Sequence, residues 1–165
     1  MKMPVKAAAF AALLMSLCVG SAQARNDAYF LPIQDALKAN KAQLGAAIRL
    51  YYADQQHPVV EATLKQGQVA NMKARAPGYK YYGESIAKTD KESIEKDDKE
   101  GCNQAMQTAL NHLQDQAYRM GGNAVINIES YYGKKAFRSV DKFECHSGSS
   151  GSGVVLRGDI VKLKQ

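Results

Sequence analysis

A long stripe of apolar side chains in the second half of the chain restricts the fold more than any other feature. From Cys102 to Met120 these side chains recur every three or four positions, which places them on one face of an α-helix. Gly121 and Gly122 then supply the left-handed turn that commonly ends a helix. Because such a helix must bury its apolar face, the chain needs a second layer to pack against it.

The charge run over residues 90–100 is typical of a solvated segment, but it also contains two signals for the start of this helix. Capping-box spacing occurs at Thr89–Glu92 and again at Asp97–Glu100. We expect the helix to begin at the second signal, because Gly101 would weaken the middle of a longer helix.

Three segments after the helix alternate apolar and polar residues, as strands with one buried face do. They are residues 123–131, 136–145 and 154–163, separated by a turn at 133–135 and a serine- and glycine-rich loop over 146–153. We expect these strands to form an antiparallel meander with a bulge at Gly158. The fold class is therefore α/β of the α+β type, a two-layer sandwich of one long amphipathic helix on a mainly antiparallel sheet.

The signals before the helix are weaker. They predict a helix over 32–42, a strand over 45–53, another strand over 67–75 and a turn at 76–78. We divide the chain into residues 1–24, an N-terminal helix and strand extension over 25–60, and a main domain over 61–165. The sequence leaves open whether the extension packs on the main domain.

The first 24 residues have the features of a cleaved secretory signal peptide. Lys2 and Lys6 precede an apolar run over 7–19 that is short for a membrane span, and Ala22-Gln23-Ala24 is a cleavage site before Arg25. Removal of the two lysines lowers the net charge from +6 to +4, which is too mild to define a nucleic-acid footprint. We therefore expect a periplasmic or secreted bacterial protein with no membrane span after cleavage, and no nucleic acid as partner.

Cleavage would leave two of the three cysteines, Cys102 and Cys145. An even number of cysteines in an exported protein predicts a disulfide. Both residues lie on the faces at which we expect the helix and the sheet to meet. The alternative is a heavy-metal site with Cys102, Cys145 and His146 as ligands, which would require reduced thiols. There are two alternatives to cleavage after Ala24: the segment is retained as an anchor, or the protein is a lipoprotein lipidated at Cys18. Leu17 stands where lipoprotein processing prefers a small residue.

The sequence contains no strong catalytic signature. It lacks G-x-x-x-x-G-K-[ST], so it has no phosphate loop of that type, and it lacks G-x-S-x-G, H-E-x-x-H and C-x-x-C. The histidines of the mature chain, His57, His112 and His146, are scattered along it. We expect a non-enzymatic binding domain without a cofactor, and not an ATPase.

Tyrosines and basic residues define a candidate partner surface. Tyr-Tyr pairs occur at 51–52, 81–82 and 131–132, and a strand would place one ring of each pair in the core and the other outside. Outward tyrosines favour binding of a protein or a cell-envelope component. The candidate residues are Lys73, Arg75, Tyr81, Tyr82 and Tyr131. The tripeptide Arg157-Gly158-Asp159 matches an adhesion motif, but it lies inside an expected strand.

Several motifs suggest a family. They are Gly121-Gly122-Asn123-Ala124-Val125-Ile126-Asn127-Ile128, Tyr131-Tyr132, Phe137-Arg138-Ser139, Phe143-Glu144-Cys145-His146 and Val154-Val155-Leu156-Arg157-Gly158. They resemble a family of small exported bacterial proteins often named "excinuclease ATPase subunit", a name that the missing phosphate loop contradicts here. More distantly, the order of elements is similar to the YbjQ-like family, described as heavy-metal-binding, and to RcsF-like periplasmic domains. These resemblances imply a compact α/β domain without known catalysis, in an envelope-sensing or accessory role.

Overall fold

The structure is a computed structural model that describes residues 25–38, 47–75 and 91–165. The expected signal peptide, the turn at 76–78, Tyr81 and Tyr82 lie outside the described residues. None of the described helices is long and apolar enough to cross a membrane.

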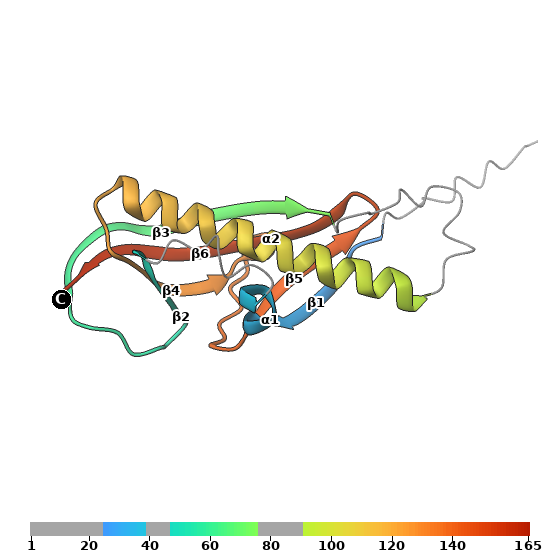
Figure 1. Cartoon of the computed structure of the whole chain (residues 1–165), viewed down its shortest axis with the longest axis horizontal. Helices are drawn as coiled ribbons and strands as arrows, with labels where there is room; N and C mark the ends of the chain where they lie inside the picture. The colour runs from blue at the N-terminus through green and yellow to red at the C-terminus, as the bar shows by residue number, and fades with distance from the viewer. Residues whose placement is uncertain (1–24, 39–46, 76–90) are drawn as a thin grey trace, which may run out of the picture.

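One long helix, α2 (Lys91–Arg119), lies across one face of a six-stranded sheet (Figure 1). Its apolar stripe is fully buried against the sheet, as the periodicity predicts. The buried residues of the stripe are Cys102, Ala105, Met106, Ala109, Leu110, Leu113 and Ala117. Met120 lies just beyond the helix and is exposed. The predicted two-layer α+β sandwich is therefore confirmed.

The start of the helix differs from the prediction. The helix begins at Lys91 and passes through Gly101 without a break. The turn before Gly101 contains Asp98, which is only 2% exposed and bonds to three strands. Tertiary contacts of this kind outweigh the low helix propensity of one glycine.

The sheet contains residues from both ends of the described chain. The strands and short helices are β1 (Asp27–Pro32), α1 (Ile33–Lys38), β2 (Arg49–Tyr52), β3 (Val60–Ala74), β4 (Ala124–Ser130), η2 (Tyr132–Lys134), β5 (Lys142–Gly148) and β6 (Gly151–Leu163). Their order is β1-β5-β6-β4-β2, and β3 pairs with the other edge of β6. All pairs are antiparallel except β2 with β4. The segment from β1 to β2 thus belongs to the same sheet as the rest.

The predicted meander is wrong, because β4 pairs with β6 and not with β5. Both β4 and β5 pair with β6, along successive stretches of the edge opposite β3. After β4 the chain leaves the sheet in the connection over residues 131–141. It re-enters the sheet as β5 at Lys142, and β5 pairs with β1 along its length. The predicted loop over 146–153 is instead a tight hairpin that turns at residues 149–150. Gly151, with a φ of 111°, supplies a backbone conformation that other residues rarely adopt.

Of the strands before the helix, β1 was not predicted and β3 is longer than predicted. β1 was not predicted, although Tyr29 and Leu31 face the core while Phe30 is exposed. β3 begins at Val60, seven residues before the predicted start at Gly67. Gly67, with a φ of 60°, lies at a register shift inside this strand rather than at its start. In β2, by contrast, Tyr52 is in the core as predicted, whereas Tyr51 is half-buried against a separate small apolar cluster instead of lying outside.

The bulge expected at Gly158 is found in the two strands that pair with β6 beside this residue, β3 and β4. The pairing shifts register in β3 between Lys65 and Gln68, and in β4 between Ile126 and Glu129. Gly158 itself lets β4 approach closely, because a Cβ atom there would lie 2.8 Å from Cγ1 of Val125.

Replacing Gly158 by alanine should lower the free energy of unfolding by about 1–3 kcal/mol, because the added methyl overpacks the core. Urea denaturation of the variant measures this loss. Gly153→Ala is a matched control in the same strand, since its added Cβ would meet nothing closer than 3.8 Å. Equal stability of the two variants would contradict the packing argument.

Candidate functional site

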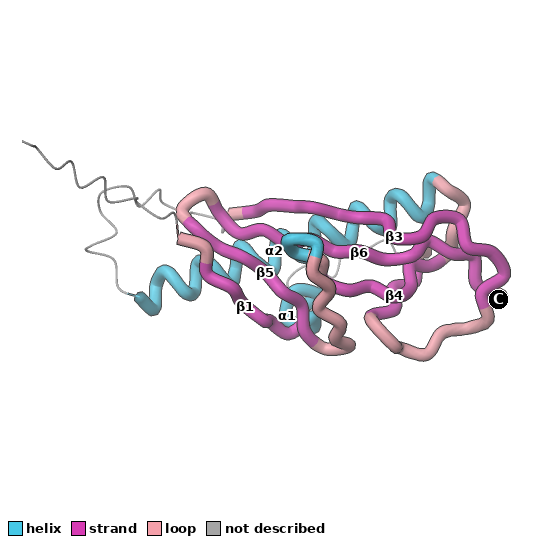
Figure 2. Tube along the Cα trace, turned by 180° about the vertical axis from the view of Figure 1, so that it is seen from behind, coloured by secondary structure: helices cyan, strands magenta, loops and turns pink. Residues whose placement is uncertain are grey.

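The two faces of the sheet have different surroundings. Val154, Leu156 and Ile160 of β6 belong to the core beneath α2, so the alternate residues of that strand face the other side. We call this other side the outer face. Figure 2 shows the connection between β4 and β5, with its short helix η2, passing over the outer face.

An ion-pair network lies on the outer face. Glu129 of β4 is only 5% exposed and accepts hydrogen bonds from Nε and Nη2 of Arg157 on the neighbouring strand, the first at 2.8 Å. Arg138, from the connection, donates to Glu129 at 2.9 Å and to Asp54 at 2.6 Å. Four segments of the chain are thereby joined, and the buried carboxylate is compensated by two guanidinium groups.

The two arginines of this network stay charged. Hydrogen bonds to Asp54 and to Glu129 raise the pKa of Arg138, and the hydrogen bonds to Glu129 raise the pKa of Arg157. The guanidinium carbon of Arg157 also lies 3.9 Å from the centre of the Tyr131 ring, a cation–π contact. The network therefore fixes the position of Tyr131 on the outer face.

An open groove of about 470 Å³ lies beside the network. Its lining residues are Gln66, Gly67, Asn127, Glu129, Arg138, Arg157, Gly158 and Asp159. Asp159 accepts hydrogen bonds from the backbone N–H of Gly67 at 2.8 Å and from Nδ2 of Asn127 at 2.9 Å, so it holds the two bulges together. The adhesion-like tripeptide thus has both of its charged side chains bonded within the fold.

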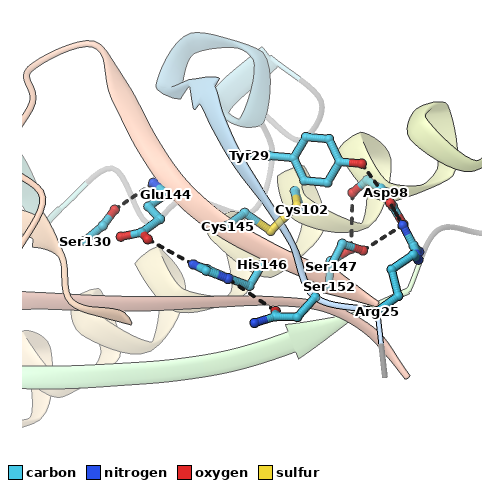
Figure 3. The surroundings of a disulfide bond; sticks show 11 residues. Arg25, Tyr29, Asp98, Cys102, Ser130, Glu144, Cys145, His146, Ser147 and Ser152 are labelled. Atoms are coloured by element: carbon cyan, nitrogen blue, oxygen red, sulfur yellow. Dashed lines mark hydrogen bonds and ion pairs between the residues drawn. A yellow bond between two sulfur atoms is a disulfide. The ribbon is translucent and has the colours of Figure 1, made fainter. Parts of the chain in front are cut away.

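A second polar group surrounds His146 of β5 (Figure 3). Its Nε2 lies 2.9 Å from Oε1 of Glu144, and its Nδ1 lies 3.2 Å from Oδ1 of Asn26. The ring stacks on Tyr132 of the connection with a centroid distance of 3.5 Å. A small pocket of about 100 Å³ adjoins it and is lined in part by Arg25, Lys73 and Tyr132.

The predicted disulfide between Cys102 and Cys145 is present, with an S–S distance of 2.04 Å and both residues fully buried. Neither sulfur is therefore a thiolate, which contradicts the metal site with Cys102, Cys145 and His146 as ligands. His146 follows Cys145 in the strand and so points to the outer face. In the described ranges, no group of three or more His, Cys, Asp or Glu residues could hold a metal ion.

A buried cluster around Asp98 is a feature that the sequence did not predict (Figure 3). Asp98 accepts hydrogen bonds from Arg25 at 3.0 Å, from Tyr29 at 2.9 Å and from Ser147 at 2.7 Å. Its backbone carbonyl accepts another from Ser152 at 3.1 Å. The cluster joins α2 to the strands β1, β5 and β6. The signal that could have revealed it is position, because Asp98 lies four residues before Cys102 on the apolar stripe.

Ionisation in this cluster follows from its contacts. Burial alone would raise the pKa of Asp98, but the hydrogen bonds from Arg25, Ser147 and Tyr29 outweigh it and hold the pKa below its ordinary value. Burial, together with the hydrogen bond to Asp98, raises the pKa of Tyr29 to about 12. The cluster therefore contains a carboxylate and a neutral phenol that hold the fold together.

The candidate partner surface is assembled only in part. Lys73 is exposed on β3 and lines the pocket beside His146, while Arg75 donates from Nε to the carbonyl of Ser150 at 3.1 Å. Tyr131 lies under Arg157 at the other polar group. The prediction that one ring of the pair 131–132 is in the core is wrong. Because the pair follows the end of β4, both rings lie against outer-face residues.

Comparison of the chain with models of protein families, with curated proteins and with solved structures finds no match.

Proposed function

We propose that this protein is an exported, non-enzymatic domain that binds a protein or another component of the cell envelope on the outer face of its sheet. The observation that carries the proposal is the outer-face ion-pair network. It holds an aromatic ring and a polar groove in one fixed arrangement. A surface ordered before its ligand arrives loses less entropy on binding.

The pairing of the charged groups favours binding over catalysis. General acid–base or nucleophilic catalysis needs a group that can change protonation or attack a substrate. Glu129 is held by two arginines, and both sulfurs of the described cysteines are joined to each other. These groups act as fixed hydrogen-bonding partners in the proposal, not as reactants.

Export is supported by two independent features. The first 24 residues have the pattern of a secretory signal peptide, and disulfides form and persist in oxidising compartments. The resemblances in sequence add an envelope-sensing or accessory role to the proposal.

A capture experiment from a bacterial envelope extract tests the proposed function. Wild-type protein should retain an envelope component that Tyr131→Ala retains about tenfold less, because aromatic anchors contribute much of the energy of an interface. Tyr118→Ala is the matched control, since Tyr118 is 73% exposed on α2, the opposite layer. Titration of the purified component against the three proteins gives the affinities. Equal affinity for all three, or no component captured above the Tyr131→Ala background, would contradict the proposal.

A further inference from the structure

Of three apolar side chains on and beside the β4–β5 connection, Phe30 and Val140 are exposed and Phe137 is half-buried. Phe30 of β1 is 50% exposed and its ring lies 4.9 Å from that of Phe137 in the connection. Val140, near the end of the same connection, is 51% exposed. These three residues line neither of the two pockets described above. Exposed apolar side chains grouped in this way mark a surface that meets something other than water.

Lysines accompany these apolar side chains. Lys134, Lys135 and Lys142 are exposed in the same stretch of chain and belong to none of the ion pairs found among the described residues. The one acid of residues 133–142, Asp141, accepts a hydrogen bond from Ser139 at 2.6 Å. We call Phe30, Lys134, Lys135, Phe137, Val140 and Lys142 the loop patch. It consists of three lysines and three apolar residues, so its net charge is positive.

This combination matches an anionic lipid surface better than a folded protein partner. Lysines near a membrane are attracted to lipid phosphates, and apolar side chains partition into the boundary between headgroups and acyl chains. A stable protein interface of ordinary size covers about 800 Å² on each partner. The loop patch has only three apolar side chains, which is few for a protein interface of that size. Attachment to a bilayer needs only a few inserted apolar side chains when basic residues beside them meet anionic headgroups.

We infer that the loop patch attaches the domain to an anionic phospholipid surface, with Phe30 and Val140 inserted among the headgroups and the lysines against lipid phosphates. This inference rests on the proposed function, because export is what brings the domain to the membranes of the envelope. Figure 2 shows the connection descending over the outer face from η2 to the start of β5, beside β1, so that its last residues lie at one margin of the molecule.

Sedimentation of the exported protein with lipid vesicles tests the inference. The protein should bind vesicles made of equal parts of phosphatidylglycerol and phosphatidylcholine, and not vesicles of phosphatidylcholine alone. Lys134→Gln/Lys135→Gln should lower binding by about tenfold or more, as expected for two lysines near the surface. Val140→Asn should lower it by about tenfold through the lost burial of one side chain.

Matched variants elsewhere on the molecule make the test specific. Lys162→Gln/Lys164→Gln removes the same charge near the C-terminus, and Val59→Asn alters a valine that is 67% exposed. Both should bind anionic vesicles like wild type. Equal losses in the loop-patch and control variants would overturn the inference. Absence of vesicle binding by a protein that still captures an envelope component through Tyr131 would overturn the inference alone. Failure of both experiments would overturn the proposed function as well.

Discussion

Replacing Asp98 by asparagine is expected to lower the free energy of unfolding by about 3 kcal/mol, since it removes the buried carboxylate that pairs with the half-buried Arg25. Asp98 is 2% exposed and is hydrogen-bonded by Arg25, Tyr29 and Ser147. Arg25 would keep only its exposed partner Asp27. The large effect follows from burial, because exposed ion pairs contribute little.

The effect of this substitution should depend on pH in a defined direction. The pKa of Asp98 lies below its ordinary value of 3.8 in the folded protein. The carboxylate therefore contributes stability that is present above pH 3.8 and is lost as the pH falls through the lower pKa of the folded state. In Asp98→Asn this contribution to the acid-induced loss of stability should be missing.

Urea denaturation of wild type and variant between neutral and acidic pH measures both effects. Asp115→Asn is the control, because Asp115 forms an exposed ion pair with Arg119 on the same helix. Its cost should stay below about 0.5 kcal/mol. A cost for Asp98→Asn as small as that of the control, or an unchanged pH dependence, would contradict the assigned role of the cluster.

Removal of the disulfide in Cys102→Ala/Cys145→Ala is expected to cost about 4 kcal/mol. The two cysteines are 43 positions apart. Without the cross-link the unfolded chain gains conformational entropy, which lowers its free energy by about 4 kcal/mol for a loop of this length. Small domains have a total stability of about 5–15 kcal/mol, so the variant should unfold at a much lower urea concentration.

Reduced wild-type protein provides the comparison for this prediction. Its stability should fall toward that of the double alanine variant, while further reductant should not affect the variant. A loss of less than about 1 kcal/mol for the double variant would contradict the prediction, because the cross-link would then hardly constrain the unfolded chain.

The disulfide and the Asp98 cluster act on the same part of the structure. Cys145 and Ser147 alternate on the inner side of β5, and they bond to Cys102 and Asp98, which are one helical turn apart (Figure 3). The two anchors fix the first half of α2 to the strand. Their effects on stability should therefore be non-additive when both are removed.

Local patterns in the sequence predicted the elements that depend on local structure. The apolar stripe predicted the body of α2 and its burial, because helical periodicity is visible in a single segment. The disulfide followed from the number of cysteines. The order of the strands was missed because pairing is decided by distant contacts: β6 meets β3, β4 and β5 at once, and no local pattern distinguishes that arrangement from a meander.

The sequence predicted some residues of the candidate site but not how they pair with one another. Lys73 and Tyr131 were selected from the sequence, and they lie at the two separate polar groups of the outer face. The pairing of Glu129 with Arg138 and Arg157 could not be predicted, because it depends on the neighbouring positions of β4 and β6 and on the path of the connection. Asp98 was assigned to a solvated charge run because its neighbours in sequence are charged.

Export is the claim on which the proposed function most depends, and the intact mass of the protein recovered from a bacterial host tests it most directly. Measured without reductant, the mass should correspond to residues 25–165 with a deficit of about two hydrogens, as expected for one disulfide. A mass that retains residues 1–24 with free thiols would contradict export, and with it the proposed binding to an envelope component.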